Sequence, residues 1–239
     1  MSKLLGGWIE FIVRSTFEGP LGQLSRFFRH DYNVIDIVYR RAAERSALFV
    51  ETYMKDAVAC RSKKLLWKLA INETNGRSNW MEFGVFKGRS INYLSKHCDT
   101  IHGFDSFDGL AENWAGNSMV KGDFSLRGKL PRVNSNVVLI KGYFHNTLEM
   151  FLADNKIKKV ELVHLDCDTY ESTVYVLDSL SHLFRDETVI IFDDFFGAPG
   201  FEQGQYRALF QFVDKNKKLS VSYLGYSRQA VVVKLHEKT

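Results

Sequence analysis

Residues 160–173, VELVHLDCDTYEST, contain the pattern that decides the fold. A short apolar run ends in two aspartates, Asp166 and Asp168, and a segment with helical periodicity follows. The same order of strand, polar residues and helix recurs along residues 79–216. Runs that are apolar throughout, rather than at alternate positions, indicate a parallel sheet that is covered by helices on both faces.

Seven apolar runs are predicted to be strands of this sheet, at 79–85, 100–105, 136–142, 160–166, 188–194, 219–225 and 229–235. The short turn YSR joins the last two, which predicts one antiparallel strand at an edge. We therefore expect an α/β fold with a Rossmann-like, doubly wound, seven-stranded and mostly parallel sheet. Ligands of such sheets bind beyond the carboxyl ends of the strands, and acids and glycines stand at those ends here.

The N-terminal part of the chain has a different pattern. Residues 1–75 are predicted to be helical, and residues 41–71 space their apolar side chains by three and four with no Gly or Pro. We expect a helical arm or lid at 1–75 and the sheet domain at 76–239. The apolar patch at 1–13 is shorter than the ~20 residues that span a bilayer, so no integral membrane segment is predicted. Contact with another subunit of a homo-oligomer is favoured over docking on a membrane surface.

Amino-acid composition indicates which kinds of binding partner and which cellular compartment to expect. The chain has 239 residues, of which 45% are apolar, and its net charge is +4. That net charge is too small to indicate nucleic-acid binding, and the sequence has no basic stripe that would support it. The three cysteines, Cys60, Cys98 and Cys167, form no CxxC motif, which favours reduced thiols and a cytoplasmic location.

A glycine-containing loop follows the first strand of the sheet domain. It reads EFGVFKG, with Glu82 in the strand and with Gly84 and Gly88 on either side of Phe86. A dinucleotide site requires G-x-G-x-x-G because the backbone must approach a pyrophosphate, and Phe86 stands where the middle glycine would be. The loop therefore favours a nucleoside ligand with a charged arm that lacks phosphate, such as S-adenosylmethionine, over NAD.

Two further polar residues fit such a ligand. Ser90 stands at the start of the next helix, where the positive end of the helix dipole favours the carboxylate of a methionine arm. Asp105 ends the second strand, 21 residues after Gly84, where an acid can accept hydrogen bonds from ribose hydroxyls. The competing interpretation is that Asp105 only caps a turn.

Four carboxylates follow the fourth and fifth strands. Asp166, Asp193 and Asp194 are expected to converge if these strands are neighbours, and oxygen-only ligands favour Mg²⁺ or a similar hard ion. Coordination lowers the pKa of a hydroxyl group, and a neighbouring carboxylate can take its proton. Asp168 is the candidate base, because residues two apart on a strand point to the same side. Alternatively, these acids only cap the segments that follow them.

Several segments together resemble a known family: MEFGVFKGRS, GFDSFDGL, VVLIKGYFHNTL, VHLDCDTYEST and IIFDDF. They are similar to class I S-adenosylmethionine-dependent methyltransferases, and among these to the macrocin/mycinamicin O-methyltransferase family, which methylates sugar hydroxyls on natural products. The resemblance covers about residues 78–235.

The resemblance implies a role for each matching position. The cofactor-binding residues would be Glu82, Gly84, Phe86, Gly88, Ser90, Asp105, Ser106, Gly142, Tyr143 and Asp166. The metal ligands would be Asp166, Asp193 and Asp194, and Asp168 would be the base, with Asp166 also catalytic. The implied function is Mg²⁺-dependent methyl transfer from S-adenosylmethionine to a small-molecule acceptor, a sugar or glycosylated metabolite. Two alternatives stay open: an NAD-linked Rossmann oxidoreductase, and a catalytically inactive binding subunit with a methyltransferase fold.

Overall fold

The computed structural model describes residues 33–114 and 118–238, and the chain divides into two units, residues 1–40 and 41–239. Of the first unit, the described part is residues 33–40, where helix α3 (Val34–Tyr53) begins. The predicted apolar patch at 1–13 lies outside the described residues. No described helix is long and apolar enough to cross a membrane.

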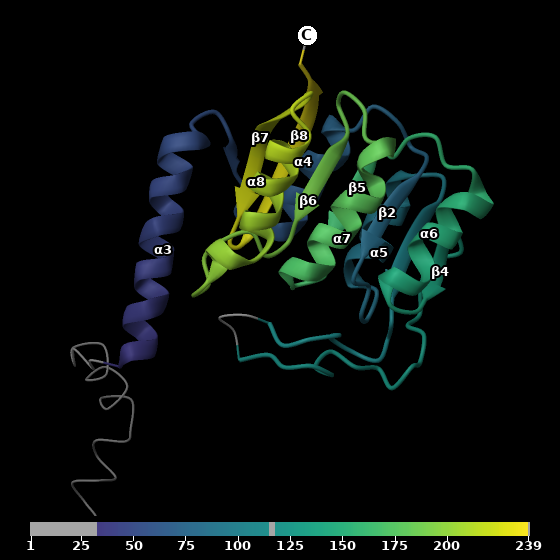
Figure 1. The fold of residues 1–239 in the computed structure, drawn as a ribbon, viewed down its shortest axis with the longest axis horizontal. Helices are drawn as coiled ribbons and strands as arrows, with labels where there is room; N and C mark the ends of the chain where they lie inside the picture. The colour runs from purple at the N-terminus through teal and green to yellow at the C-terminus, as the bar shows by residue number, and fades with distance from the viewer. Residues whose placement is uncertain (1–32, 115–117, 239) are drawn as a thin grey trace, which may run out of the picture. The chain divides into compact units, whose positions relative to one another are not determined.

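The second unit is built on one eight-stranded sheet (Figure 1). Its order across the sheet is β1-β7-β8-β6-β5-β2-β3-β4. The strands are β1 (Val58–Ala59), β2 (Trp80–Phe83), β3 (Ile101–Asp105), β4 (Val137–Lys141), β5 (Leu162–Leu165), β6 (Val189–Phe192), β7 (Leu219–Ser227) and β8 (Ala230–Glu237). The predicted α/β sheet is confirmed, with eight strands instead of seven. The additional strand is β1, whose two residues are too few to form a periodic pattern.

The strands are mostly parallel, and the antiparallel pairing lies at one side of the sheet. β2, β3, β4, β5 and β6 pair in parallel with their neighbours. β8 is antiparallel to both β6 and β7, so the chain returns between them instead of adding β8 outside β7. The parallel strands therefore end at one common edge, which is where the site lies.

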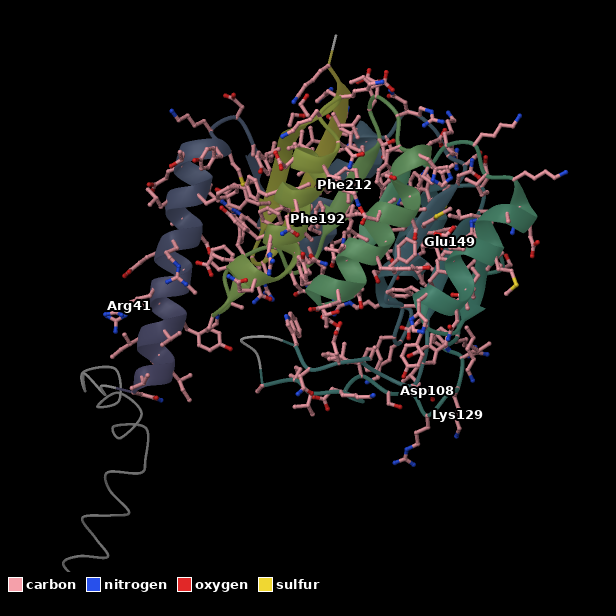
Figure 2. All side chains as sticks on the ribbon, viewed as in Figure 1. Arg41, Asp108, Lys129, Glu149, Phe192 and Phe212 are labelled. Atoms are coloured by element: carbon pink, nitrogen blue, oxygen red, sulfur yellow. The ribbon has the colours of Figure 1, made fainter. Side chains whose placement is uncertain are left out.

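Helices cover both faces, as the apolar strands predict. On one side, α6 (Phe144–Asn155), α7 (Tyr170–Leu180) and α8 (Gln205–Lys215) bury a core to which Phe192 and Phe212 belong (Figure 2). On the other side, α4 (Lys63–Glu73) and α5 (Arg89–Leu94) bury a second core. Alternate residues of each strand serve the two cores, because successive side chains of a strand point to opposite faces.

The helix expected over residues 41–71 is interrupted. α3 ends at Tyr53, the chain forms β1 against β7, and α4 starts only at Lys63. Ser62 is the N-cap of α4, with φ −153° and ψ 153°, and its hydroxyl accepts a hydrogen bond from the backbone N–H of Leu65 at 3.3 Å. A serine at this position satisfies an N–H that has no partner within the helix, and so defines where α4 starts.

Candidate active site

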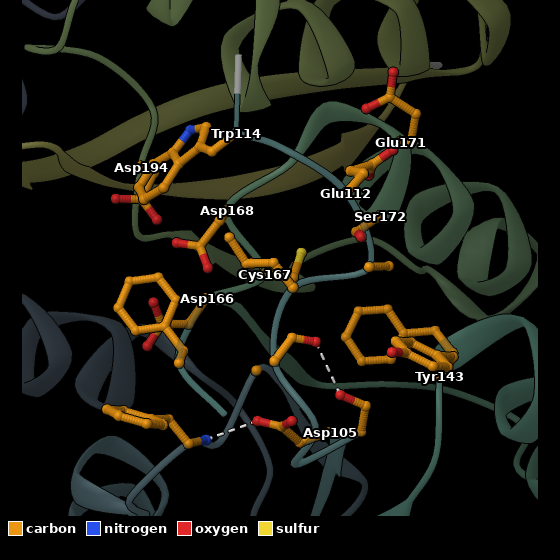
Figure 3. Close-up of a pocket in the computed structure, with 18 of the residues that line it drawn as sticks. Asp105, Glu112, Trp114, Tyr143, Asp166, Cys167, Asp168, Glu171, Ser172 and Asp194 are labelled. Carbon is orange, nitrogen blue, oxygen red and sulfur yellow. Dashed lines mark hydrogen bonds between the residues drawn. The ribbon is translucent and has the colours of Figure 1, made fainter. Parts of the chain in front are cut away.

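A cavity of about 580 Å³ opens at the carboxyl edge of the parallel strands (Figure 3). Nine of the predicted site residues line it: Gly84, Phe86, Asp105, Ser106, Tyr143, Asp166, Asp168, Asp193 and Asp194. Glu82, Gly88, Ser90 and Gly142 are not among its lining residues. The cavity thus receives residues from the ends of β2, β3, β4, β5 and β6.

Gly84 forms the floor of this cavity. Its φ is +89°, and a Cβ atom built there would lie 1.8 Å from the backbone oxygen of Asp166. Its N–H donates to the carbonyl oxygen of Phe104 at 2.9 Å, while the N–H of Asp166 donates to that of Phe83 at 2.8 Å. Only glycine fits here, because the ends of three strands meet with no room for a side chain.

Asp105 shapes the loop that follows Gly84. Its Oδ2 accepts hydrogen bonds from the N–H groups of Val85 at 2.8 Å and Phe86 at 2.7 Å, and its Oδ1 accepts one from Phe107 at 2.7 Å. Each carboxylate oxygen can accept more than one such bond, and Asp105 lines the cavity, so it keeps capacity for a ligand hydroxyl. The two interpretations of Asp105, as turn anchor and as ligand contact, are therefore compatible.

The remaining predicted loop residues hold the turns around the cavity. Gly88 is the N-cap of α5 with φ +75°, and Gly142 has φ +144° and donates its N–H to the carbonyl of Asp105 at 2.9 Å. The Ser106 hydroxyl donates to the carbonyl of Gly109 at 3.1 Å and accepts from the N–H of Asp108 at the same distance. Ser106 thus holds the turn after β3.

Glu82 and Ser90 belong to a buried polar network. Glu82 is opposite His164 in the register of β2 and β5, and the two side chains are hydrogen-bonded from Oε2 to Nδ1 at 2.9 Å. The Ser90 hydroxyl donates to the other oxygen, Oε1, at 2.9 Å. Both Glu82 and His164 are fully buried. Glu82 therefore faces α5 from within the sheet instead of opening into the cavity.

Electrostatics make this network an ion pair. Burial raises the pKa of the Glu82 carboxyl, although the bond to His164 offsets part of this effect. For His164, burial lowers the pKa, but the nearby Asp193 carboxylate and the hydrogen bond to Glu82 outweigh burial and leave the pKa well above its ordinary value. These shifts favour the protonated form of His164, which lies beside the carboxyl groups of Glu82 and Asp193.

Three carboxylates converge on one side of the cavity, at the left of the view in Figure 3. Oxygens of Asp166, Asp168 and Asp194 lie within 4.8 Å of one another. Asp193 is not in this group, because its Oδ2 forms an ion pair with Lys63 and its Oδ1 lies 3.7 Å from His164 Nε2. The grouping differs from the sequence-based expectation, which combined Asp193 with Asp166 and Asp194 and placed Asp168 beside them.

Asp168 reaches the group by a turn and not by strand alternation. β5 ends at Leu165, and Asp168 has φ +62°, in the left-handed region that side chains rarely adopt. The N–H of Thr169 bonds the carbonyl of Cys167 at 2.6 Å, and Thr169 is the N-cap of α7. The tight turn into α7 therefore directs Asp168 toward Asp194, and the strand argument for its position is wrong.

The three convergent acids have raised pKa values. Burial, reinforced by the charge of Asp166, raises the pKa of Asp168 to about 8. Burial and the neighbouring carboxylates also raise the pKa of Asp166 and of Asp194 well above the ordinary range. Asp193 behaves oppositely: burial alone would raise its pKa, but His164 and Lys63 outweigh burial and lower it.

Comparison with known proteins identifies the domain. Residues 81–195 match the family model described as "Methyltransferase domain". The chain carries a methyltransferase domain. This confirms the resemblance to methyltransferases. The cavity lies beyond the carboxyl ends of the parallel strands, where ligands of open α/β sheets bind. A search of curated protein sequences finds no match.

Solved structures share the fold of the methyltransferase domain. The calicheamicin methyltransferase CalS11 is 19% identical, covers 87% of this chain and 95% of its own, and has a TM-score of 0.60. The O-methyltransferase NovP is 20% identical, covers 74% of this chain and 80% of its own, and has a TM-score of 0.53. An apo structure of CalS11, described as a TDP-rhamnose 3'-O-methyltransferase, is 19% identical over 87% and 97% of the two chains, with a TM-score of 0.52.

Three residues of the methyltransferase-domain site had no signal in the sequence. Lys63 comes from the start of α4 and lies 130 positions before its partner Asp193. Gln205 joins two strand ends, since its Oε1 accepts from the N–H of Asp194 at 2.9 Å and its Nε2 donates to the carbonyl of Leu165 at 3.0 Å. Trp114 lines the cavity next to Asp194 (Figure 3). Each contact depends on packing between distant segments.

Proposed function

We propose that the chain transfers a methyl group from S-adenosylmethionine to a hydroxyl of a sugar or glycosylated metabolite, with a divalent ion such as Mg²⁺ at the acidic group. The observation that carries this proposal is the set of three convergent carboxylates in the wall of the cavity that contains the glycine loop. Two relatives of the same fold support the substrate class: NovP is described as an O-methyltransferase, and CalS11 as acting on TDP-rhamnose.

The cavity offers a place for each part of the cofactor. Asp105 would accept hydrogen bonds from the ribose hydroxyls. Tyr143 would provide a flat surface for the adenine; its ring is stacked on that of His145 with 5.9 Å between centroids. Gly84 and Phe86, which border the cavity, would contact the methionine arm.

The acidic group fits a hard divalent ion. Asp166, Asp168 and Asp194 present oxygen ligands only, as Mg²⁺ prefers. Asp194 Oδ2 is buried and has no hydrogen-bond partner among the described residues. Burial and mutual repulsion raise the pKa of all three acids and outweigh the opposing charges of His164 and Lys63. A divalent ion supplies additional positive charge, and it lowers the pKa of a hydroxyl that it contacts.

The chain's own residues would orient the acceptor and take its proton. The acceptor oxygen forms a bond to the methyl carbon, the carbon–sulfur bond breaks, and the sulfur keeps that electron pair. The hydroxyl proton would pass to Asp168, whose carboxylate borders the cavity. Trp114 would hold the acceptor against the carboxylates, since it borders the same cavity.

Methyl transfer from labelled S-adenosylmethionine to a panel of glycosylated metabolites and sugar nucleotides tests the proposal. Asp168→Asn should lower kcat about 100-fold or more, the usual range for a lost general base. Calorimetry with S-adenosylhomocysteine should give an affinity within about threefold of the wild type. Asp154→Asn, on the exposed side of α6, is the matched control. Full turnover in excess EDTA would refute the ion, and cofactor binding without turnover on any hydroxyl acceptor would favour the binding subunit.

A further inference from the structure

Gln205 connects the ends of the two neighbouring strands that acids of the site follow. It is the first residue of α8, and its side chain is fully buried. Its Oε1 accepts a hydrogen bond from the N–H of Asp194 at 2.9 Å, and its Nε2 donates one to the carbonyl of Leu165 at 3.0 Å. An amide can make both bonds at once, because it carries an acceptor and a donor side by side.

The backbone pairing of β5 and β6 ends just before Asp194. Leu165 is opposite Phe192 in the register, and the N–H of Asp193 donates to the Leu165 carbonyl at 3.0 Å. The next N–H along the chain, that of Asp194, donates to the Gln205 amide. Gln205 therefore extends the connection between the two strands to Asp194.

The same bond closes a loop. Gln205 lies 11 positions after Asp194, so its side chain joins the two ends of the segment between them. Within this segment, the N–H of Gly197 donates to the Ser46 hydroxyl of α3 at 2.9 Å. That bond holds the middle of the loop, whereas the Gln205 bond acts on Asp194 itself.

Asp194 needs such a hold because other carboxylates surround it. One of its oxygens lies within 4.8 Å of oxygens of Asp166 and Asp168. Ionised carboxylates at this distance repel one another when no cation lies between them. The backbone of Asp166 is fixed by β2, since its N–H donates to the carbonyl of Phe83 at 2.8 Å. The bonds at Asp166 and Asp194 therefore oppose the separation of the two acids.

We propose that Gln205 is a positioning residue that holds Asp194 within reach of a divalent ion shared with Asp166. This rests on the ion of the proposed function. Partners that orient metal ligands in this way typically contribute about 10–100-fold to metal affinity or activity. Loss of the Gln205 amide should release the backbone at Asp194 and weaken ion binding, while the cofactor residues that follow β2 and β3 keep their places.

Titration calorimetry of the purified full chain with MgCl₂ and MnCl₂, and separately with S-adenosylhomocysteine, tests this inference. Gln205→Met removes both hydrogen bonds at nearly constant side-chain length. Its ion affinity should fall at least about tenfold, while its affinity for S-adenosylhomocysteine should stay within about threefold of the wild type. A smaller loss of ion affinity, or an equal loss of both affinities, overturns the proposal.

Gln211→Met is the matched control. Gln211 lies on the exposed side of α8, and its Oε1 accepts a hydrogen bond from the Tyr170 hydroxyl. The control therefore makes the same substitution on the same helix and also removes a hydrogen bond, but away from the strand ends. Its ion affinity should stay within about twofold of the wild type, and a loss as large as that of Gln205→Met would refute a specific role for Gln205.

Gln205→Glu keeps the inference testable if Gln205→Met folds poorly. It retains the acceptor for the Asp194 N–H, and the Leu165 carbonyl still accepts from Asp193, so ion affinity should stay within about threefold of the wild type; a larger loss overturns the proposal. In an Asp194→Asn background, Gln205→Met should cause less than about twofold further loss, because both changes act through one ligand. Absence of ion binding in the wild type would refute the ion and this inference with it, whereas ion binding that Gln205→Met leaves unchanged would refute this inference alone.

Discussion

Replacement of Asp168 by Asn should stabilise the ion-free protein at high pH. The three acids have oxygens within 4.8 Å of one another. At an effective dielectric constant of about 20, two unit charges at that separation repel by roughly 3 kcal/mol. Asp168→Asn keeps the shape of the side chain and removes its charge, so it relieves repulsion of about this size once Asp168 would be ionised.

The sign follows from the direction of the pKa shift. The pKa of Asp168 is raised in the folded protein to about 8, so the folded state holds a proton that the unfolded chain releases near pH 4. This proton contributes stability that is fully present below pH 4 and is lost as the pH rises through 8. Asn never ionises, and the variant should therefore gain on the wild type as the pH rises.

Calorimetric melting at pH 5 and pH 9, each with EDTA and with excess MgCl₂, measures this effect. With about 2–4 °C per kcal/mol, the variant should melt roughly 6–12 °C above the wild type at pH 9 in EDTA, and above it by a clearly smaller margin at pH 5, where the loss has only begun. Saturating MgCl₂ should stabilise the wild type more and reverse the order. A variant that melts below the wild type at pH 9 in EDTA would show that ionised Asp168 is stabilised by the fold, which refutes the reasoning.

Three other substitutions test the site. Gly84→Ala should lose more than about 4 kcal/mol of unfolding free energy in denaturant titration, because its Cβ would lie 1.8 Å from the Asp166 carbonyl oxygen at φ +89°; a loss under 1 kcal/mol contradicts this. Asp105→Ala leaves three N–H groups without their acceptor, so it should lower the free energy of unfolding by about 2–4 kcal/mol. It should also weaken S-adenosylhomocysteine binding more than tenfold in calorimetry, and unchanged binding would show that Asp105 only anchors the turn. Trp114→Ala should raise the acceptor KM about tenfold while cofactor affinity stays constant, and a change in cofactor affinity alone would remove Trp114 from the acceptor side.

The sequence predicts the sheet well because its strands are strongly apolar. Every predicted strand is present, and acids and glycines stand at the carboxyl edge as expected. The ends of strands were predicted less well: β5 and β6 end at Leu165 and Phe192, before the aspartates. An apolar pattern identifies the residues that pack on a core, but where a strand stops pairing depends on its neighbours. This is why Asp168 reaches its place by a turn.

The directions in which polar side chains point could not be predicted without the pairing register of the strands. Glu82 has the same place in the motif whether it faces a ligand or the interior, and only its pairing with His164 across β2 and β5 shows that it faces the interior. The separation of Asp193 from Asp194 likewise depends on Lys63, which no local pattern connects to either residue. Sequence reasoning therefore located the chemistry at the correct edge but could not assign partners within it.

Charge balance connects these partners to the proposed reaction. Of the five acids around His164 and Lys63, Glu82 and Asp193 are the two that contact these basic side chains. The remaining three, Asp166, Asp168 and Asp194, have no ion pair among the described residues. A divalent ion and a sulfonium together carry three positive charges, which match the three unpaired carboxylates. Methyl transfer converts the sulfonium to a neutral thioether, and the acceptor proton then neutralises one carboxylate. The net charge of this group of three carboxylates with its ligands would therefore stay the same in the proposed reaction, because the proton on Asp168 would replace the charge that the sulfur loses.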